Sequence, residues 1–300
     1  MYGCRGKILQ MVILIVAFLG LAFGSFVNAL VFRLHMQSKR RLAVSDKRLA
    51  KKAKGQQLKA SSYSVLKGRS MCPHCRHQLE AIDLIPLISW LALRGKCRYC
   101  NKPISAQYPL VELSTAALFL LSYILFPYYN LAPITYNLLL LLWLAILTGL
   151  IALFVYDLKW MILPNKIVFP LIFLASAHAF ILMLQSDSVG QWLLGLGGSL
   201  AVSFGLFYLL FQLSDGRWIG GGDVKFSVVY ALLLADPLKS GMVLFAASLI
   251  GTTLVLPSLL NKQRDLKAKL PFGPLLITAT IIVYLFGHHL AVAYSSFVGI

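Results

Sequence analysis

Only 13% of the 300 residues are charged and 59% are hydrophobic, whereas about a quarter of the residues in a soluble domain carry charge. The 28 Lys and Arg outnumber the 10 Asp and Glu, which gives a formal net charge of +18, and the mean hydropathy is +0.77. These values exclude an ordinary soluble domain and predict a membrane protein.

Apolar runs of about 20 residues are long enough to cross a bilayer as helices. Eight candidate runs follow one another along the chain: 8–32, 110–126, 134–156, 167–184, 193–213, 224–235, 241–260 and 273–294. The sixth run is too short to cross as a straight helix. We therefore predict an all-α polytopic membrane protein with about eight transmembrane helices. Its expected parts are a first transmembrane helix (1–34), a basic cytoplasmic domain (35–108) and a seven-helix membrane domain (109–300).

The distribution of basic residues predicts the orientation in the membrane. Of the 28 Lys and Arg, 17 lie between Arg33 and Lys102, where only Asp46, Glu80 and Asp83 oppose them. If the helices alternate in direction, the remaining loops on that side are rich in Lys and Arg, and those on the other side hold only Lys239. Because short basic loops stay on the cytoplasmic side, we expect the long loop to be cytoplasmic. A signal-peptide interpretation of the first run would instead export this loop.

Two pairs of cysteines lie in the long loop. Cys72 and Cys75 form one Cys-x-x-Cys motif and Cys97 and Cys100 form another, with a separation typical of four-thiolate zinc ribbons. Zinc is favoured over disulfides in a reducing compartment, although paired disulfides or free thiols remain alternatives. His74 and His77 could substitute as ligands, and solvated roles compete with that interpretation. The fifth cysteine, Cys4, is left over.

The densest basic cluster, "SKRRLAVSDKRLAKKAKGQQLK" (38–59), raises the question of nucleic-acid binding. It contains no aromatic residue on which a base could stack. Attraction to anionic lipid headgroups explains the cluster more simply, and a solvated basic segment explains it without any specific ligand. We therefore expect contact with membrane lipid and no specific nucleic acid.

Asp157, in "FVYDLKWMILPN", and Asp223, in "GGGDVK", stand at the inner ends of membrane helices. Acids at such depth are costly and suggest function. Structural explanations also exist, because Asp223 could cap a helix that begins at Val224 and Asp157 could be an interfacial residue near Lys159.

The helix lengths place the two acids at a similar depth. Thr135 to Asp157 spans about 33 Å of helix, and Asp223 to Asp236 spans only about 20 Å. Asp223 is therefore expected below the membrane surface, where irregular backbone is tolerated only inside protein or beside a wet cavity. Glycines before it would allow close approach of backbone or substrate. The two carboxylates are thus expected on different helices at a similar depth. A pair of acids that activates water requires this arrangement.

The chain resembles the type IV prepilin peptidases. These are bifunctional enzymes, leader peptidase and N-methyltransferase, and they belong to the membrane aspartic proteases with a GxGD motif. The motifs occur in order along nearly the whole chain: "GSFVNALVFRL", "GRSMCPHC", "GKCRYC", "YPLVEL", "DLKWMILPN", "GGGDVK" and "KLPFGP". The resemblance implies that Asp157 and Asp223 are the catalytic aspartates. Gly220, Gly221 and Gly222 would shape the turn that aims Asp223. We expect Lys225, Pro164 and Asn165 to support the site, and "KLPFGP" (269–274) to line the substrate path.

The resemblance also implies the substrate and the cofactors. The substrate would be a type IV prepilin or pseudopilin precursor, cut at the cytoplasmic face of the bacterial inner membrane between its basic leader and its apolar helix. The new N-terminus would be methylated with S-adenosylmethionine, for which the residues themselves give no separate signal. Two alternatives belong to other classes of protein: a transporter with buried acids, and a catalytically silent membrane scaffold with a zinc-ribbon docking domain.

Overall fold

The computed structural model describes residues 2–45, 70–72, 74–75, 77–128, 130–260 and 271–298. Most of the basic cluster 38–59, together with Lys269 and Leu270 of the "KLPFGP" motif, lies outside these residues. The described chain forms two compact units, Met1–Leu121 and Ser122–Ile300, which we treat separately.

The prediction of an all-α membrane protein is confirmed for the described residues, whose only strand-like features are two isolated β-bridges. The longer elements are α1 (Tyr2–Ser45), α4 (Gln107–Leu125), α5 (Pro133–Trp160), α6 (Asn165–Leu184), α7 (Val189–Leu200), α8 (Leu206–Leu213), α9 (Gly221–Leu234), α10 (Pro237–Leu260) and α11 (Phe272–Val298). Three short elements are the 3₁₀ helix η2 (Ala81–Leu84), α3 (Ile88–Ala92) and the π-helix η3 (Ala201–Gly205).

Six stretches of the described helices are long and apolar enough to cross a membrane, and α11 adds the shorter apolar stretch Phe272–Gly287. The run expected at 193–213 is built from α7, η3 and α8, which together form one of these six stretches, Val189–Leu213. The run expected to be too short is α9, with 14 residues. The chain is therefore a multi-pass membrane protein, with one helix that does not match the bilayer in length.

In the first unit, glycines of α1 allow the backbones of α1 and α4 to approach closely. A Cβ atom at Gly24 would lie 2.6 Å from the Cα atom of Glu112, and one at Gly20 would be similarly close to Ala116. The Asn28 side chain donates a hydrogen bond to the carbonyl of Tyr108 (3.1 Å). Small residues are the usual means of close helix contact in membranes. The motifs "GSFVNALVFRL" and "YPLVEL" thus contact each other directly.

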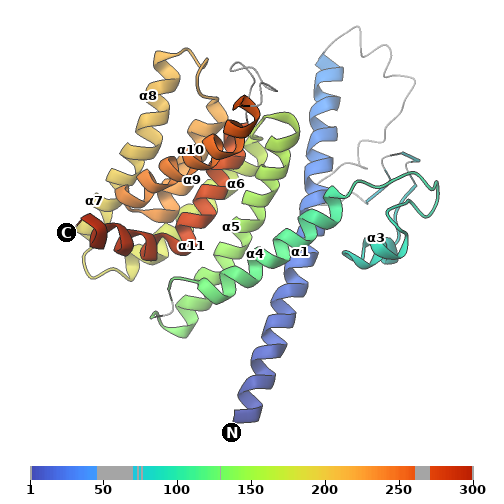
Figure 1. Cartoon of the computed structure of the whole chain (residues 1–300), viewed down its shortest axis with the longest axis horizontal. Helices are drawn as coiled ribbons and strands as arrows, with labels where there is room; N and C mark the ends of the chain where they lie inside the picture. The colour runs from blue at the N-terminus through green and yellow to red at the C-terminus, as the bar shows by residue number, and fades with distance from the viewer. Residues whose placement is uncertain are drawn as a thin grey trace. The chain divides into compact units, whose positions relative to one another are not determined.

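In the second unit, α5 carries many buried side chains and packs against α6 and α11, while α9 packs against α6 and α7 (Figure 1). The core includes the fully buried side chains of Trp143, Phe226 and Tyr230. Trp143 stacks on the ring of Tyr284 (centroids 3.7 Å apart) and donates a hydrogen bond to Ser122 (2.9 Å). These contacts join the middle of α5 to the middle of α11.

Candidate active site and cysteine cluster

Asp157 lies in the last turn of α5, where its side chain is buried. The helix ends at Trp160, and the next residue, Met161, adopts a left-handed conformation (φ 52°) and donates its N–H to the carbonyl of Asp157 (2.8 Å). The chain then passes through Leu163 and Pro164 into α6, whose first residue is Asn165. The carboxylate is therefore carried by the rigid end of a core helix and not by a mobile loop.

Asp223 is the third residue of α9, which begins at Gly221 and not at Val224 as the sequence suggested. Gly220 is extended and precedes the helix, and its carbonyl accepts the N–H of Asp223 (3.0 Å). The expected turn of three glycines is thus one turn residue followed by two helical glycines. At Gly222 the absence of a Cβ atom allows the first turn of this helix to pack closely.

The packing explains one of these three glycines. A Cβ atom at Gly222 would lie 2.9 Å from the Cβ atom of Leu163, so the first turn of α9 touches the segment that follows Asp157. A Cβ atom at Gly221 would lie 3.7 Å from the ring of Phe211, which is ordinary contact. Gly222 is therefore the glycine that allows the motifs "DLKWMILPN" and "GGGDVK" to meet.

The two acids also face a glycine at the start of α11, Gly273. A Cβ atom at Gly273 would collide with a carboxylate oxygen of Asp157 and would lie 3.6 Å from a carboxylate oxygen of Asp223. Both carboxylates are thus within 4 Å of one point beside the α11 backbone. Three helix ends that are far apart in the sequence meet here.

The structure also places the supporting residues that the sequence suggested. The Lys225 ammonium donates a hydrogen bond to the Asn165 side chain (3.0 Å), which links the first turns of α9 and α6. Pro164 precedes α6, and its carbonyl accepts the N–H of Ile167 (2.9 Å). Gly273 belongs to "KLPFGP", which the sequence linked only to the substrate path. The sequence therefore identified the motif that contains Gly273. The contact of Gly273 with the two acids became visible only in the packed helices.

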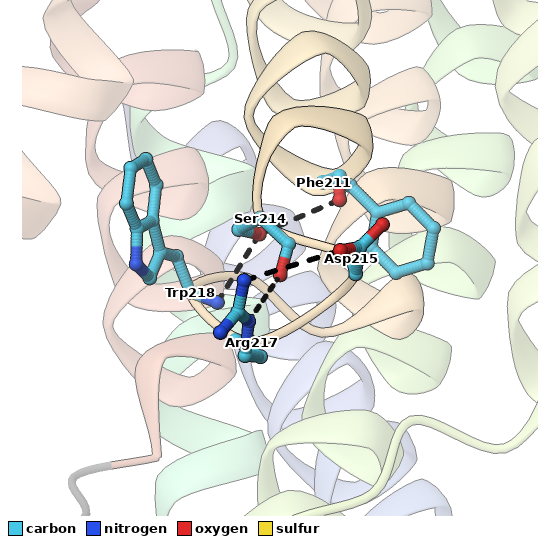
Figure 2. A network of polar contacts seen from close by, with 5 residues as sticks. All are labelled: Phe211, Ser214, Asp215, Arg217 and Trp218. Carbon is cyan, nitrogen blue, oxygen red and sulfur yellow. Dashed lines mark hydrogen bonds and ion pairs between the residues drawn. The ribbon is translucent and has the colours of Figure 1, made fainter.

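A tight turn between α8 and α9 leads into Gly220 (Figure 2). The buried Ser214 hydroxyl accepts the N–H of Trp218 (3.3 Å), and the Ser214 carbonyl accepts Nε of Arg217 (3.0 Å). Asp215 and Gly216 both adopt left-handed conformations (φ 50° and 72°). The Arg217–Asp215 ion pair is exposed and contributes little. No motif in the sequence predicted this turn, which sets the direction in which the chain enters α9.

The four cysteines of the long loop come together in the first unit. The Sγ atoms of Cys72, Cys75, Cys97 and Cys100 all lie within 4.8 Å of one another, and those of Cys72 and Cys100 are 3.9 Å apart. Tetrahedral coordination with Zn–S bonds of about 2.3 Å places sulfurs about 3.8 Å apart, so this spacing fits a metal ion. The four thiols are free. The group of described residues that could hold a metal consists of these four cysteines and does not include His74 or His77.

Each pair of cysteines is formed by local hydrogen bonds. Cys72 donates its N–H to the carbonyl of His77 (3.0 Å), and Cys97 donates its N–H to that of Lys102 (2.9 Å). An isolated β-bridge flanks each pair, Met71 with Gln78 and Lys96 with Pro103. Burial alone would raise the pKa of the Cys72 thiol, but hydrogen bonds from the backbone of Cys75 and His74 and from neighbouring thiols lower that pKa to about 7. A thiolate is the form that binds metal.

The fold and these two sites define a polytopic membrane protein that brings two carboxylates together at helix ends and carries a separate cluster of four cysteines. The model of the Bacterial Peptidase A24 N-terminal domain matches residues 18–126, and that of the Type IV leader peptidase family matches residues 144–256. The chain belongs to the type IV leader peptidase family, which confirms the resemblance seen in the motifs.

Relatives in this family align with most of the chain. The prepilin leader peptidase/N-methyltransferase of Aeromonas hydrophila is 33% identical over 268 residues, which are 89% of this chain and 88% of that protein. The protein with this name from Pseudomonas aeruginosa is 31% identical over 284 residues, or 94% and 92% of the two chains. The one from Bacillus subtilis is 33% identical over 230 residues, or 75% and 84%. No solved structure matches the chain.

Proposed function

We propose that the protein is a membrane aspartic endopeptidase that removes the basic leader from type IV pilin-like precursors and N-methylates the new N-terminus. The observation that carries the peptidase proposal is the meeting of Asp157 and Asp223 beside Gly273. The names of the relatives support the same activities. The proposed division of the chain follows the sequence: a first helix (1–34), a cysteine domain (35–108) and a peptidase domain (109–300).

Two carboxylates this close cannot both ionise without strong repulsion, so the pair holds one proton. The ionised carboxylate takes a proton from a water molecule as that water attacks the scissile carbonyl. The protonated carboxyl donates a hydrogen bond to the developing oxyanion and then a proton to the leaving amine. Because the two roles differ, neither acid can replace the other. Gly273 lets the α11 backbone lie directly beside the acids, where a side chain would collide with the Asp157 carboxylate.

We place this site near the cytoplasmic face of the inner membrane, because the loops predicted on that side carry most of the basic residues. The junction between a basic leader and an apolar helix would lie at the same level. Anionic lipid on that face would also attract the basic cluster 38–59.

We propose that Cys72, Cys75, Cys97 and Cys100 hold a structural zinc ion. Bound zinc would join the two hydrogen-bonded turns and supply folding free energy to a small domain. Methyl transfer would use S-adenosylmethionine, and this part of the proposal rests on family membership, because no set of residues here is assigned to that cofactor.

The proposal is tested with purified protein in liposomes, a synthetic prepilin precursor and S-adenosylmethionine carrying a labelled methyl group. We expect a shortened product with an intact apolar segment and a labelled N-terminus. The same peptide without its basic leader is the matched control and should not be shortened. A precursor that stays intact would contradict the peptidase proposal, and a shortened but unlabelled product would contradict methylation alone.

A further inference from the structure

An apolar surface lies between the two cysteine pairs and outside the membrane-spanning helices. We call it the η2–α3 face; it consists of Ile82 and Leu84 in η2, Ile85 just after η2, and Ile88 and Leu91 in α3. These side chains are between 39% and 64% exposed. Large apolar residues on the surface of a membrane span are expected, because lipid covers them in the bilayer. These five residues belong to none of the candidate spans. An apolar face concentrated in ten residues is typical of an interaction surface.

A hydrogen bond fixes the depth of this face relative to α4. Leu87 donates its N–H to the carboxylate of Glu112 (2.8 Å), and Glu112 is buried. Glu112 lies five residues after Gln107, the first residue of a candidate span, which corresponds to about 7.5 Å along the helix. Side chains on a helix point back toward its N-terminus, so Leu87 lies beside the first turns of α4. The η2–α3 face is therefore at the boundary between the span and the polar loop.

Other contacts hold the face so that its apolar side chains point outward. The Trp90 ring packs against Gly95, and its indole N–H donates a hydrogen bond to the carbonyl of Ile104 (3.3 Å). Asp83 accepts an ion pair from Arg98 (3.0 Å) and a hydrogen bond from the Tyr99 hydroxyl (3.0 Å). These anchors connect η2 and α3 to residues 95–104, around the second cysteine pair, and the five apolar side chains stay exposed.

Charge near the face favours an anionic partner. The exposed residues Arg94 and Lys96 directly follow α3, and the adjoining segment 33–69 is strongly basic. Interfacial segments combine apolar side chains buried about 5–10 Å into the headgroup region with Lys and Arg that contact anionic lipids. The η2–α3 face has both features. Its hydrogen bond to Glu112 of α4 places it at the level where that membrane span begins.

We propose that the η2–α3 face is a lipid-binding surface that lies in the headgroup region of the bilayer and holds the cysteine domain against the membrane. The partner is a phospholipid surface containing anionic headgroups. This inference depends only on the first unit and does not require the proposed peptidase activity.

Photo-crosslinking tests this proposal on the full chain in nanodiscs of phosphatidylethanolamine and phosphatidylglycerol. The photoreactive amino acid p-benzoylphenylalanine replaces Ile88 or Leu91 in separate proteins. Lys102, which is exposed in the same loop, is the matched polar control, and Phe18, 65% exposed in the α1 span, gives the yield at a lipid-facing position. Intact-mass analysis after irradiation measures the adducts.

We expect a mass increase of one phospholipid at positions 88 and 91, with a yield near that of position 18 and well above that of position 102. Crosslinks from position 88 or 91 to residues 122–300 would show that another part of the chain covers the face. Either that result, or lipid adducts at 88 and 91 no more frequent than at 102, would overturn the proposal.

Discussion

The acid pair and the cysteine cluster are assembled by different kinds of contact. The cysteine cluster is made of two short turns, each closed by hydrogen bonds between residues only five positions apart along the chain. The acid pair has no such local scaffold, because Asp157, Asp223 and Gly273 come from the ends of three different helices. A local site tolerates changes in distant packing, whereas a site at a meeting of helix ends depends on every close approach that brings the ends together.

The largest effect should follow from neutralising either acid. Asp157→Asn or Asp223→Asn should each lower the rate of precursor cleavage by about 10²- to 10⁴-fold, because each removes one of two proton-transfer roles. Cleavage of the synthetic precursor by equal amounts of membrane-inserted protein measures this. Asp215→Asn is the matched control, since that carboxylate is exposed in the turn before α9, and it should cleave normally. Near-normal cleavage by either of the first two variants would remove that residue from the catalytic pair.

A methyl group at Gly273 should be almost as damaging, although it changes no charge. The Cβ atom of Gly273→Ala would collide with the Asp157 carboxylate, and a displacement of about 1 Å in a catalytic group costs about 10²-fold in rate. Gly241→Ala is the control, because a Cβ atom there meets nothing within 4 Å. Equal cleavage rates for the two variants would show that α11 does not border the reacting groups. Metal content should be the same in both.

The contact between α9 and Leu163 predicts a smaller effect. Gly222→Ala places a methyl group 2.9 Å from the Cβ atom of Leu163, and overpacking of this kind costs about 1–3 kcal/mol. We expect a lower midpoint of thermal unfolding and a moderate loss of cleavage. Gly221→Ala is the paired control, because its Cβ atom would make only ordinary contact with Phe211. If Gly221→Ala proved the more harmful, the close approach at Leu163 would not be what orders the acids.

The cysteine variants should have the smallest effect on cleavage and the largest on metal. Cys72→Ser or Cys100→Ser should release zinc and loosen residues 72–100, yet cleavage should fall less than in the aspartate variants, because the acids lie on other segments. Methyl transfer, if it belongs to this loop, should suffer at least as much as cleavage. Zinc content, cleavage and methyl transfer are measured on the same preparations, with Cys4→Ser as the control.

Either of two results would change the comparison between the two sites. A cysteine variant that keeps stoichiometric zinc would contradict the four-thiolate site. A variant that loses zinc and all cleavage together would show that the cysteine loop is part of the peptidase architecture.

Much of the molecule follows from local patterns in the sequence. Long apolar runs predict membrane helices because backbone polar groups in lipid must be paired within the segment. Two Cys-x-x-Cys motifs predict a cluster because each needs only a tight turn to point two thiols the same way. Family membership could be inferred from the ordered motifs. These inferences succeed because each depends on residues that are close together in the chain.

Tertiary structure decided what no local pattern contains. From the sequence, the glycines before Asp223 indicate only that another part of the molecule can approach closely. The structure shows that Leu163 is the residue that lies close to Gly222. The start of α9 at Gly221, and the position of Gly273 against both acids, likewise depend on the packing of α5, α9 and α11. The hydrogen bond from Leu87 to Glu112, 25 residues later in the chain, sets the depth of the η2–α3 face relative to α4. Contacts between distant segments depend on which surfaces fit together when the helices pack, and hydropathy and motif spacing do not contain that information.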